Sequence, residues 1–320
     1  MSTSAMRYPR SAPLEGVLFF PVTPFDADGA LNEDALAEHV RRGVSAGAGG
    51  VFVACGTGEF HALEPGEYER VVRIAVEQTA SRVPVFAGCG GALPLTRQFA
   101  AAARRAGADG LLLLPPYLVS CPPDGLVKFV EEVAASTPLP VIVYQRSNAV
   151  FTPDAAVQVA RLPNVVGFKD GLGDLDAMQR IVLAVRAAIG DKPFQFFNGM
   201  PTAEMTQLAY RAIGVELYSS AVFCFAPEIA LAFYAAARSN DHARANALLE
   251  QFYAPLVKLR NKVPGYAVSL IKAATTLSGI EVGPVRPPLL DATAEDVDEL
   301  VGIIAAGRAL TTAANLAAAT

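Results

Sequence analysis

Eight short apolar runs recur along the chain, and their spacing restricts the possible folds more than any other feature of the sequence. They are rich in Val, Leu, Ile and Phe with little polar alternation, which is typical of parallel strands buried on both faces. Amphipathic segments that we predict to be helices separate them. The runs cover 16–22, 49–54, 84–88, 110–115, 140–144, 165–169, 194–198 and 215–219, and the intervening segments lie near 32–48, 65–82, 94–107, 123–136, 153–161, 174–189 and 201–213.

Strands and helices that alternate in this way predict an α/β fold, the closed (β/α)8 TIM barrel with right-handed crossovers. An open doubly wound sheet is the alternative, but it would carry a glycine-rich dinucleotide turn after its first strand, where this chain has Pro21-Val22-Thr23-Pro24-Phe25. We predict a flexible tail over 1–13, a barrel over 14–239 and a C-terminal helical extension over 240–320 packed on the barrel. Its helices are expected near 241–262, 265–278 and 294–308, after a last barrel helix near 226–239.

Composition excludes several classes of function. The 320 residues are 52% hydrophobic with a net charge of −5, and charges of both signs are scattered, so neither nucleic acid nor a membrane surface is an expected partner. No apolar stretch reaches the roughly 18–20 residues that span a bilayer, and the first fifteen residues lack an apolar secretory core. The cysteines and histidines are isolated, which favours a cytoplasmic location and no metal site.

Lys169 is the strongest candidate for chemistry. It is the only one of the six lysines that directly ends an apolar run, and a glycine-containing turn follows it. An amine at the mouth of a buried strand is well placed to attack a carbonyl and form a Schiff base, although an ordinary surface lysine would also fit this pattern. The amine must be neutral to attack. Apolar walls such as Val143, Phe168 and Phe197 would lower its pKa by desolvation.

Other candidates lie where neighbouring strands are predicted to end. Tyr144 would place a phenol at the barrel mouth to relay protons, or would simply pack in the core. The amides of Gly56-Thr57-Gly58 would hold a carboxylate, or form a plain tight turn. Arg146 would contact a carboxylate through two parallel hydrogen bonds, or lie exposed in solvent. Asp174 is predicted to cap the following helix rather than to bind a cation.

With these residues in order on their strands, the chain resembles the dihydrodipicolinate synthase and N-acetylneuraminate lyase superfamily of Schiff-base barrels over about residues 14 to 310. Within the superfamily it is most similar to the branch that dehydrates sugar diacids. The matching motifs are Pro21-Val22-Thr23-Pro24-Phe25, Gly56-Thr57-Gly58-Glu59-Phe60, Tyr144, Gly167-Phe168-Lys169-Asp170-Gly171, Asn198-Gly199-Met200-Pro201-Thr202-Ala203-Glu204, Tyr218-Ser219-Ser220-Ala221 and Val263-Pro264-Gly265-Tyr266-Ala267-Val268.

This resemblance implies a lyase that removes water and carbon dioxide from 5-dehydro-4-deoxy-D-glucarate to give 2,5-dioxopentanoate, with no cofactor and no metal. It implies a homotetramer or homodimer. The alternatives are a class I aldolase or synthase that acts on pyruvate or another 2-keto-3-deoxy sugar acid, and a catalytically silent barrel that serves as a scaffold. The expected catalytic residues are Lys169, Tyr144 and Thr57, and the expected substrate-binding residues are Gly56, Gly58, Arg146, Asn198 and Ser220.

Overall fold

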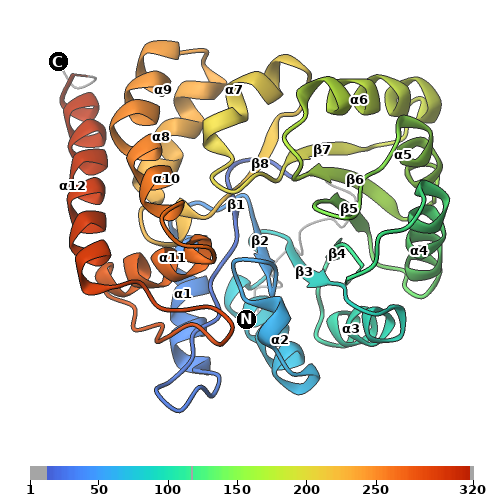
Figure 1. The fold of residues 1–320 in the computed structure, drawn as a ribbon, viewed down its shortest axis with the longest axis horizontal. Coiled ribbons are helices and arrows are strands. Elements are labelled where there is room, and N and C mark those ends of the chain that lie inside the picture. The colour runs from blue at the N-terminus through green and yellow to red at the C-terminus, as the bar shows by residue number, and fades with distance from the viewer. Residues whose placement is uncertain (1–12, 117, 318–320) are drawn as a thin grey trace, which may run out of the picture.

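A computed structural model describes residues 13–116 and 118–317, and it shows eight parallel strands that close into a barrel in sequence order (Figure 1). Closure comes from the pairing of the first strand with the last, in which Leu18 lies opposite Ser219. The predicted (β/α)8 barrel is therefore confirmed. Residues 1–12 of the predicted tail lie outside the described residues. The strands are β1 (Leu18–Phe19), β2 (Gly50–Val53), β3 (Val85–Cys89), β4 (Gly110–Leu113), β5 (Val141–Gln145), β6 (Val165–Asp170), β7 (Gln195–Asn198) and β8 (Leu217–Ser220).

Helices follow the strands and form the outer layer of the barrel. Asn32, Thr152 and Asp174 each accept a hydrogen bond from a backbone amide in the first turn of the helix that follows, so the predicted cap at Asp174 is confirmed. The helices are α1 (Glu33–Ser45), α2 (Pro65–Thr79), α3 (Leu93–Arg105), α4 (Pro123–Ala135), α5 (Pro153–Ala160), α6 (Leu175–Ile189), α7 (Glu204–Ala212) and α8 (Pro227–Arg238).

Alternation along the strands divides the apolar residues into two clusters. One lies inside the barrel, where the rings of Phe20, Phe52 and Phe86 stack with centroids 4.7 and 5.1 Å apart. The other fills the layer between strands and helices, and it contains Val143 and Phe168. Because successive side chains of a strand point to opposite faces, the residue before Lys169 must face outward. The prediction that Val143 and Phe168 wall the lysine was therefore wrong, and Phe197 alone of the three lies in the inner cluster.

The chain continues after α8 as α9 (His242–Leu248), α10 (Ala254–Arg260), α11 (Tyr266–Leu277) and α12 (Ala294–Ala317). Figure 1 shows these helices beside α7 and α8, on the side of the barrel away from α4 and α5. A π-helical turn, Leu249–Tyr253, divides the single helix predicted over 241–262. Pro255 near the start of α10 has no amide hydrogen for an ordinary helical bond, which favours such an irregular turn at this point.

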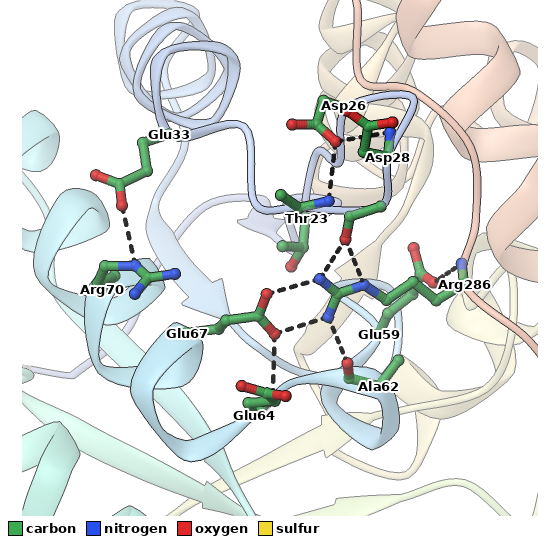
Figure 2. Close-up of polar contacts among 12 residues, drawn as sticks. Thr23, Asp26, Asp28, Glu33, Glu59, Ala62, Glu64, Glu67, Arg70 and Arg286 are labelled. Atoms are coloured by element: carbon green, nitrogen blue, oxygen red, sulfur yellow. Dashed lines mark hydrogen bonds and ion pairs between the residues drawn. The ribbon is translucent and has the colours of Figure 1, made fainter.

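Two cations from the C-terminal part of the chain bind the loop that follows β2. Lys272 of α11 donates to Glu59 Oε1 over 2.9 Å, and both side chains are almost fully buried, with exposed fractions of 2% and 0%. The amide of Arg286 donates to Glu59 Oε2, while its guanidinium forms two hydrogen bonds with Glu67 (Figure 2). The same guanidinium donates to the carbonyl oxygens of Gly29 and Ala62. These contacts hold the segment around α11 against the carboxyl end of the barrel.

We expect Lys272→Met to lower the free energy of unfolding by about 3–5 kcal/mol, because it leaves the carboxylate of Glu59 buried without its cation. Urea unfolding should show this loss, and the double variant with Glu59→Gln should recover part of it. Lys258→Met, at an exposed position of α10, is the matched control and should be nearly neutral. A loss as small as that of the control would contradict a structural role for the pair.

Candidate active site

A cavity of about 350 Å³ opens at the carboxyl ends of the strands, a size in the range of ~300–1,000 Å³ usual for small-molecule sites. Strand ends and the loops after β2 and β7 supply one part of its wall, while α10 and α11 supply another. Lys169, Tyr144, Thr57, Gly56 and Arg146 all line it. The structure thus brings together five of the eight predicted site residues, from three separate parts of the chain.

Lys169 lies inside the barrel near its mouth, with only 5% of its surface exposed. Its Nζ is 4.2 Å from the ring centroid of Phe20 and 4.7 Å from that of Tyr144. Burial lowers the pKa of the amine to about 7, because desolvation penalises the charged form, and the nearby cation of Arg146 acts in the same direction. About half of the amine is then neutral at pH 7, so it can act as a nucleophile.

Tyr144 stands next to the lysine in the β5–β6 register. Its hydroxyl donates to the carbonyl oxygen of Gly199 over 2.7 Å and lies 3.5 Å from Nη1 of Arg146. Burial raises the pKa of the phenol, while the Arg146 cation opposes that shift. The phenol therefore keeps its proton at neutral pH and can pass it to or from an atom bound beside Lys169.

The side chains of Lys169 and Tyr144 pack so close to residue 199 that only glycine fits there. A Cβ atom at this position would come within 2.6 Å of Cε of Lys169 and within 2.7 Å of Cε2 of Tyr144. Gly171 is similar, because a Cβ there would lie 2.8 Å from the Tyr144 hydroxyl oxygen. Replacement of Gly199 or Gly171 by any residue with a side chain would therefore displace the Lys169 amine or the Tyr144 phenol from its present position.

The loop after β2 presents unused donors to the cavity. Among the described residues, none accepts a hydrogen bond from the amides of Gly56, Thr57 or Gly58, and the Thr57 hydroxyl is likewise without a partner there. Gly56 and Thr57 line the cavity, whereas Gly58 lies behind them and its carbonyl accepts from Thr23 Oγ1 over 2.6 Å. Successive free amides of this kind form a small positive pocket suited to a carboxylate.

Asn198 and Ser220 lie at strand ends as expected, but neither lines the cavity. The Asn198 amide donates to Ala203 O, Thr206 Oγ1 and Gln207 Oε1, so it organises the β7–α7 loop. The Ser220 hydroxyl donates to Glu204 Oε1 over 2.6 Å. Both side chains are fully buried in these bonds, and the structure does not place them with the other predicted site residues.

Several lining residues were given no role in the predicted site, among them Glu204, Ser219, Arg260, Tyr266 and Cys55. Ser219 directly precedes Ser220, the serine that was predicted, and successive residues of a strand point to opposite faces. Arg260 and Tyr266 come from the extension; Tyr266 lies in one of the matching motifs, whereas no motif or apolar pattern marks Arg260. Burial raises the pKa of Cys55 to about 12, so at neutral pH its side chain is a protonated thiol and not a nucleophilic thiolate.

Glu204 begins α7 and is 1% exposed. Its Oε1 accepts from Ser220, while its Oε2 has no partner among the described residues. Burial raises the pKa of this carboxyl to about 7. It is therefore partly protonated at neutral pH and can either donate or accept a hydrogen bond at the cavity wall.

Within residues 13–116 and 118–317, no three His, Cys, Asp or Glu side chains gather as metal ligands would. In the same part of the chain, no helix combines the length and apolar character needed to cross a bilayer.

The fold and the buried amine at its carboxyl rim place the chain among the (β/α)8-barrel lyases. The family model for the Dihydrodipicolinate synthetase family matches residues 13–307, and the chain belongs to this family. It is 58% identical over 308 residues to a Streptomyces coelicolor protein named Probable 5-dehydro-4-deoxyglucarate dehydratase 1, covering 96% of this chain and 98% of that one. A similarly named protein of Bradyrhizobium diazoefficiens is 47% identical over 290 residues, covering 90% and 91%.

Among solved structures, the dihydrodipicolinate synthase from Bacillus clausii superimposes with a TM-score of 0.84 at 26% identity, covering 92% of this chain and 98% of that chain. The resemblance that the strand-end motifs indicated, to this superfamily and to its sugar-diacid dehydratases, is therefore confirmed.

We expect Lys169→Met to stabilise the protein at low pH. The unfolded chain keeps the proton up to about pH 10.5 but the folded chain only to about pH 7, so the unfolded state binds more protons between these values and stability rises with pH. The cost of burying the amine, on the order of 5 kcal/mol, is complete below pH 7 and absent above about pH 10.5.

Urea unfolding at pH 6 and at pH 9.5 measures this difference. The variant should gain several kcal/mol at pH 6 and less at pH 9.5, since the penalty falls by ~1.36 kcal/mol per unit of pH. Lys128→Met, at an exposed position of α4, is the control. An equal effect of Lys169→Met at both pH values would contradict a depressed pKa for this amine.

Proposed function

We propose that the protein is a Schiff-base lyase that dehydrates and decarboxylates 5-dehydro-4-deoxy-D-glucarate to 2,5-dioxopentanoate, carbon dioxide and water. The observation that carries the chemistry is the buried amine of Lys169, whose pKa is lowered to about 7, beside the Tyr144 phenol. The names of relatives that are 46–58% identical over 90% or more of this chain support the choice of substrate.

Lys169 opens the proposed reaction by attacking the ketone that stands next to one carboxylate of the substrate. The carbinolamine then loses water to form an iminium ion. Tyr144 is the proposed proton carrier for both steps, because its hydroxyl lies at the inner wall beside the amine and keeps its proton at neutral pH. The free amides of Gly56 and Thr57 are proposed to hold the carboxylate next to the ketone.

The iminium acidifies the neighbouring methylene, whose proton passes to a base. Tyr144, or a relay through the unpartnered hydroxyl of Thr57, is proposed to move it. Hydroxide then leaves the next carbon and takes up a proton as water. The conjugated iminium accepts the electron pair released when the distal carboxylate departs as carbon dioxide. Protonation and hydrolysis return Lys169 and the product. The iminium acts as the electron sink, so the proposed route uses no cofactor.

The cytoplasmic location and the assembly into a homotetramer or homodimer remain proposals. They come from the composition and the family resemblance. Size-exclusion chromatography with light scattering tests the assembly directly.

Treatment with substrate and borohydride should trap the adduct on Lys169, which peptide mass spectrometry locates. The same incubation without borohydride should release one carbon dioxide per substrate consumed and yield 2,5-dioxopentanoate. Lys169→Met should give neither adduct nor product. An adduct at another lysine would contradict the assignment of the nucleophile. Cleavage to pyruvate without carbon dioxide would instead identify an aldolase.

The pH dependence of kcat/KM should show an acid limb with an apparent pKa near 7, because protonated Lys169 cannot attack. Removal of the neighbouring cation in Arg146→Met should shift this limb to higher pH, since that cation lowers the lysine pKa. Glu204 titrates in the same range, so Glu204→Gln is the necessary control and should leave the limb in place. Loss of the limb in Glu204→Gln would assign it to the carboxyl instead.

A further inference from the structure

We propose that Arg260 binds the second carboxylate of the substrate and so makes the site selective for dicarboxylic over monocarboxylic keto acids. This inference rests on the proposed function, because it concerns the end of the substrate away from the Schiff base. It gives a charged residue of the extension, whose helices α10 and α11 already supply part of the cavity wall, a role in binding substrate.

Arg260 ends α10 and lines the cavity in a half-buried position. Its Nη1 donates to Thr202 Oγ1 over 2.7 Å, while Nε and Nη2 donate to Asn261 Oδ1 over 3.2 and 3.1 Å. Thr202 thus fixes the guanidinium at Nη1, and Asn261 fixes it at Nε and Nη2. Its plane is therefore set by protein groups before any ligand arrives.

The charge of Arg260 has no counter-ion among the residues that the structure describes. Across residues 13–116 and 118–317, no carboxylate comes within ion-pairing distance of its guanidinium. Arg286 provides the contrast, because that guanidinium forms two hydrogen bonds to Glu67. Burial lowers the pKa of Arg260, so the fold bears a desolvation cost that a bound anion would offset.

The donors left over on Arg260 match a carboxylate. A guanidinium has five N–H groups, and three bonds to Thr202 and Asn261 leave one N–H on each of the two terminal nitrogens. With one N–H left on each terminal nitrogen, the guanidinium can donate to a carboxylate, the anion that arginine binds best. Leu256, Val222 and Ile271 also line the cavity, and an apolar wall strengthens an ion pair by excluding water.

Arg146 does not fill the same role. It is exposed, and its Nη1 lies 3.5 Å from the Tyr144 hydroxyl, so it belongs to the part of the site where the ketone reacts. The distal carboxylate lies at the other end of the substrate carbon chain. Arg260 reaches the cavity from α10, a different wall, and among the described residues it is the other arginine that lines the cavity.

Binding and orientation are the expected contributions of Arg260. The distal carboxylate keeps its charge through Schiff-base formation and loss of water, and loses it only when carbon dioxide departs. An ion pair to it therefore stabilises the bound substrate and these earlier transition states alike. Removing the guanidinium should therefore act mainly on KM. A lysine should restore only part of the affinity, because an ammonium lacks the fixed planar donors of a guanidinium.

The test compares Arg260→Met and Arg260→Lys with the wild-type protein on two substrates, 5-dehydro-4-deoxy-D-glucarate and 2-keto-3-deoxy-D-gluconate, which carries a hydroxymethyl group in place of the distal carboxylate. We expect Arg260→Met to lower kcat/KM for the diacid roughly 30- to 150-fold, mostly through KM, and to change that for the monoacid little. Arg260→Lys should fall between. Arg161→Met, at an exposed position after α5, is the matched control.

Two further measurements separate the possible failures. Trapping of pyruvate on Lys169 by borohydride requires only one carboxylate, so its rate should be unchanged in Arg260→Met. An equal loss on pyruvate and on the diacid would show a structural role and overturn the proposal. Calorimetric binding of D-glucarate and D-gluconate needs no turnover. If the wild-type protein releases no carbon dioxide from the diacid, the proposed function fails. The role of Arg260 is judged separately by calorimetry. It stands if Arg260→Met abolishes the preference for D-glucarate over D-gluconate, and it is overturned if that preference remains.

Discussion

Closure of the barrel through the β1–β8 pair is the constraint on which the site depends. It joins the first and last strands into one ring, so that all eight carboxyl ends meet at one rim. Phe20, just beyond β1, then lies 4.2 Å from the Lys169 amine of β6. The interior is filled by stacked aromatic rings and excludes water. That desolvation is the largest cause of the lowered lysine pKa, so the pKa is a consequence of barrel packing.

The extension is the second structural condition for the site. A buried ion pair between Lys272 and Glu59, together with the Arg286 contacts of Figure 2, joins the α11 region to the loop after β2. The same loop carries the free amides of Gly56 and Thr57. One cluster of charges therefore supports both the proposed carboxylate pocket and the wall that closes the cavity. Ion pairs this deeply buried contribute little net stability, but the loss of either partner is costly because it leaves a buried charge unpaired.

Much of the fold was predictable because parallel strands buried on both faces leave a direct pattern in the sequence. Lys169 and Tyr144 were predictable for the same reason, since each ends an apolar run, and the structure places them together. Asn198 and Ser220 also end strands but turn away from the cavity, because local hydrogen bonds take up their side chains. Strand-end position alone could not distinguish these two cases.

The sequence by itself determined the barrel, the order of its strands and the one lysine that ends a buried run, because hydrophobic periodicity and chain connectivity are local properties. The tertiary structure alone decided the pKa of that lysine and the placement of Arg260 and Glu204 at the cavity. The physical reason is that desolvation and unpaired charge depend on every group that surrounds an atom. Those groups come from segments far apart in the chain, and only the folded barrel with its extension brings them together.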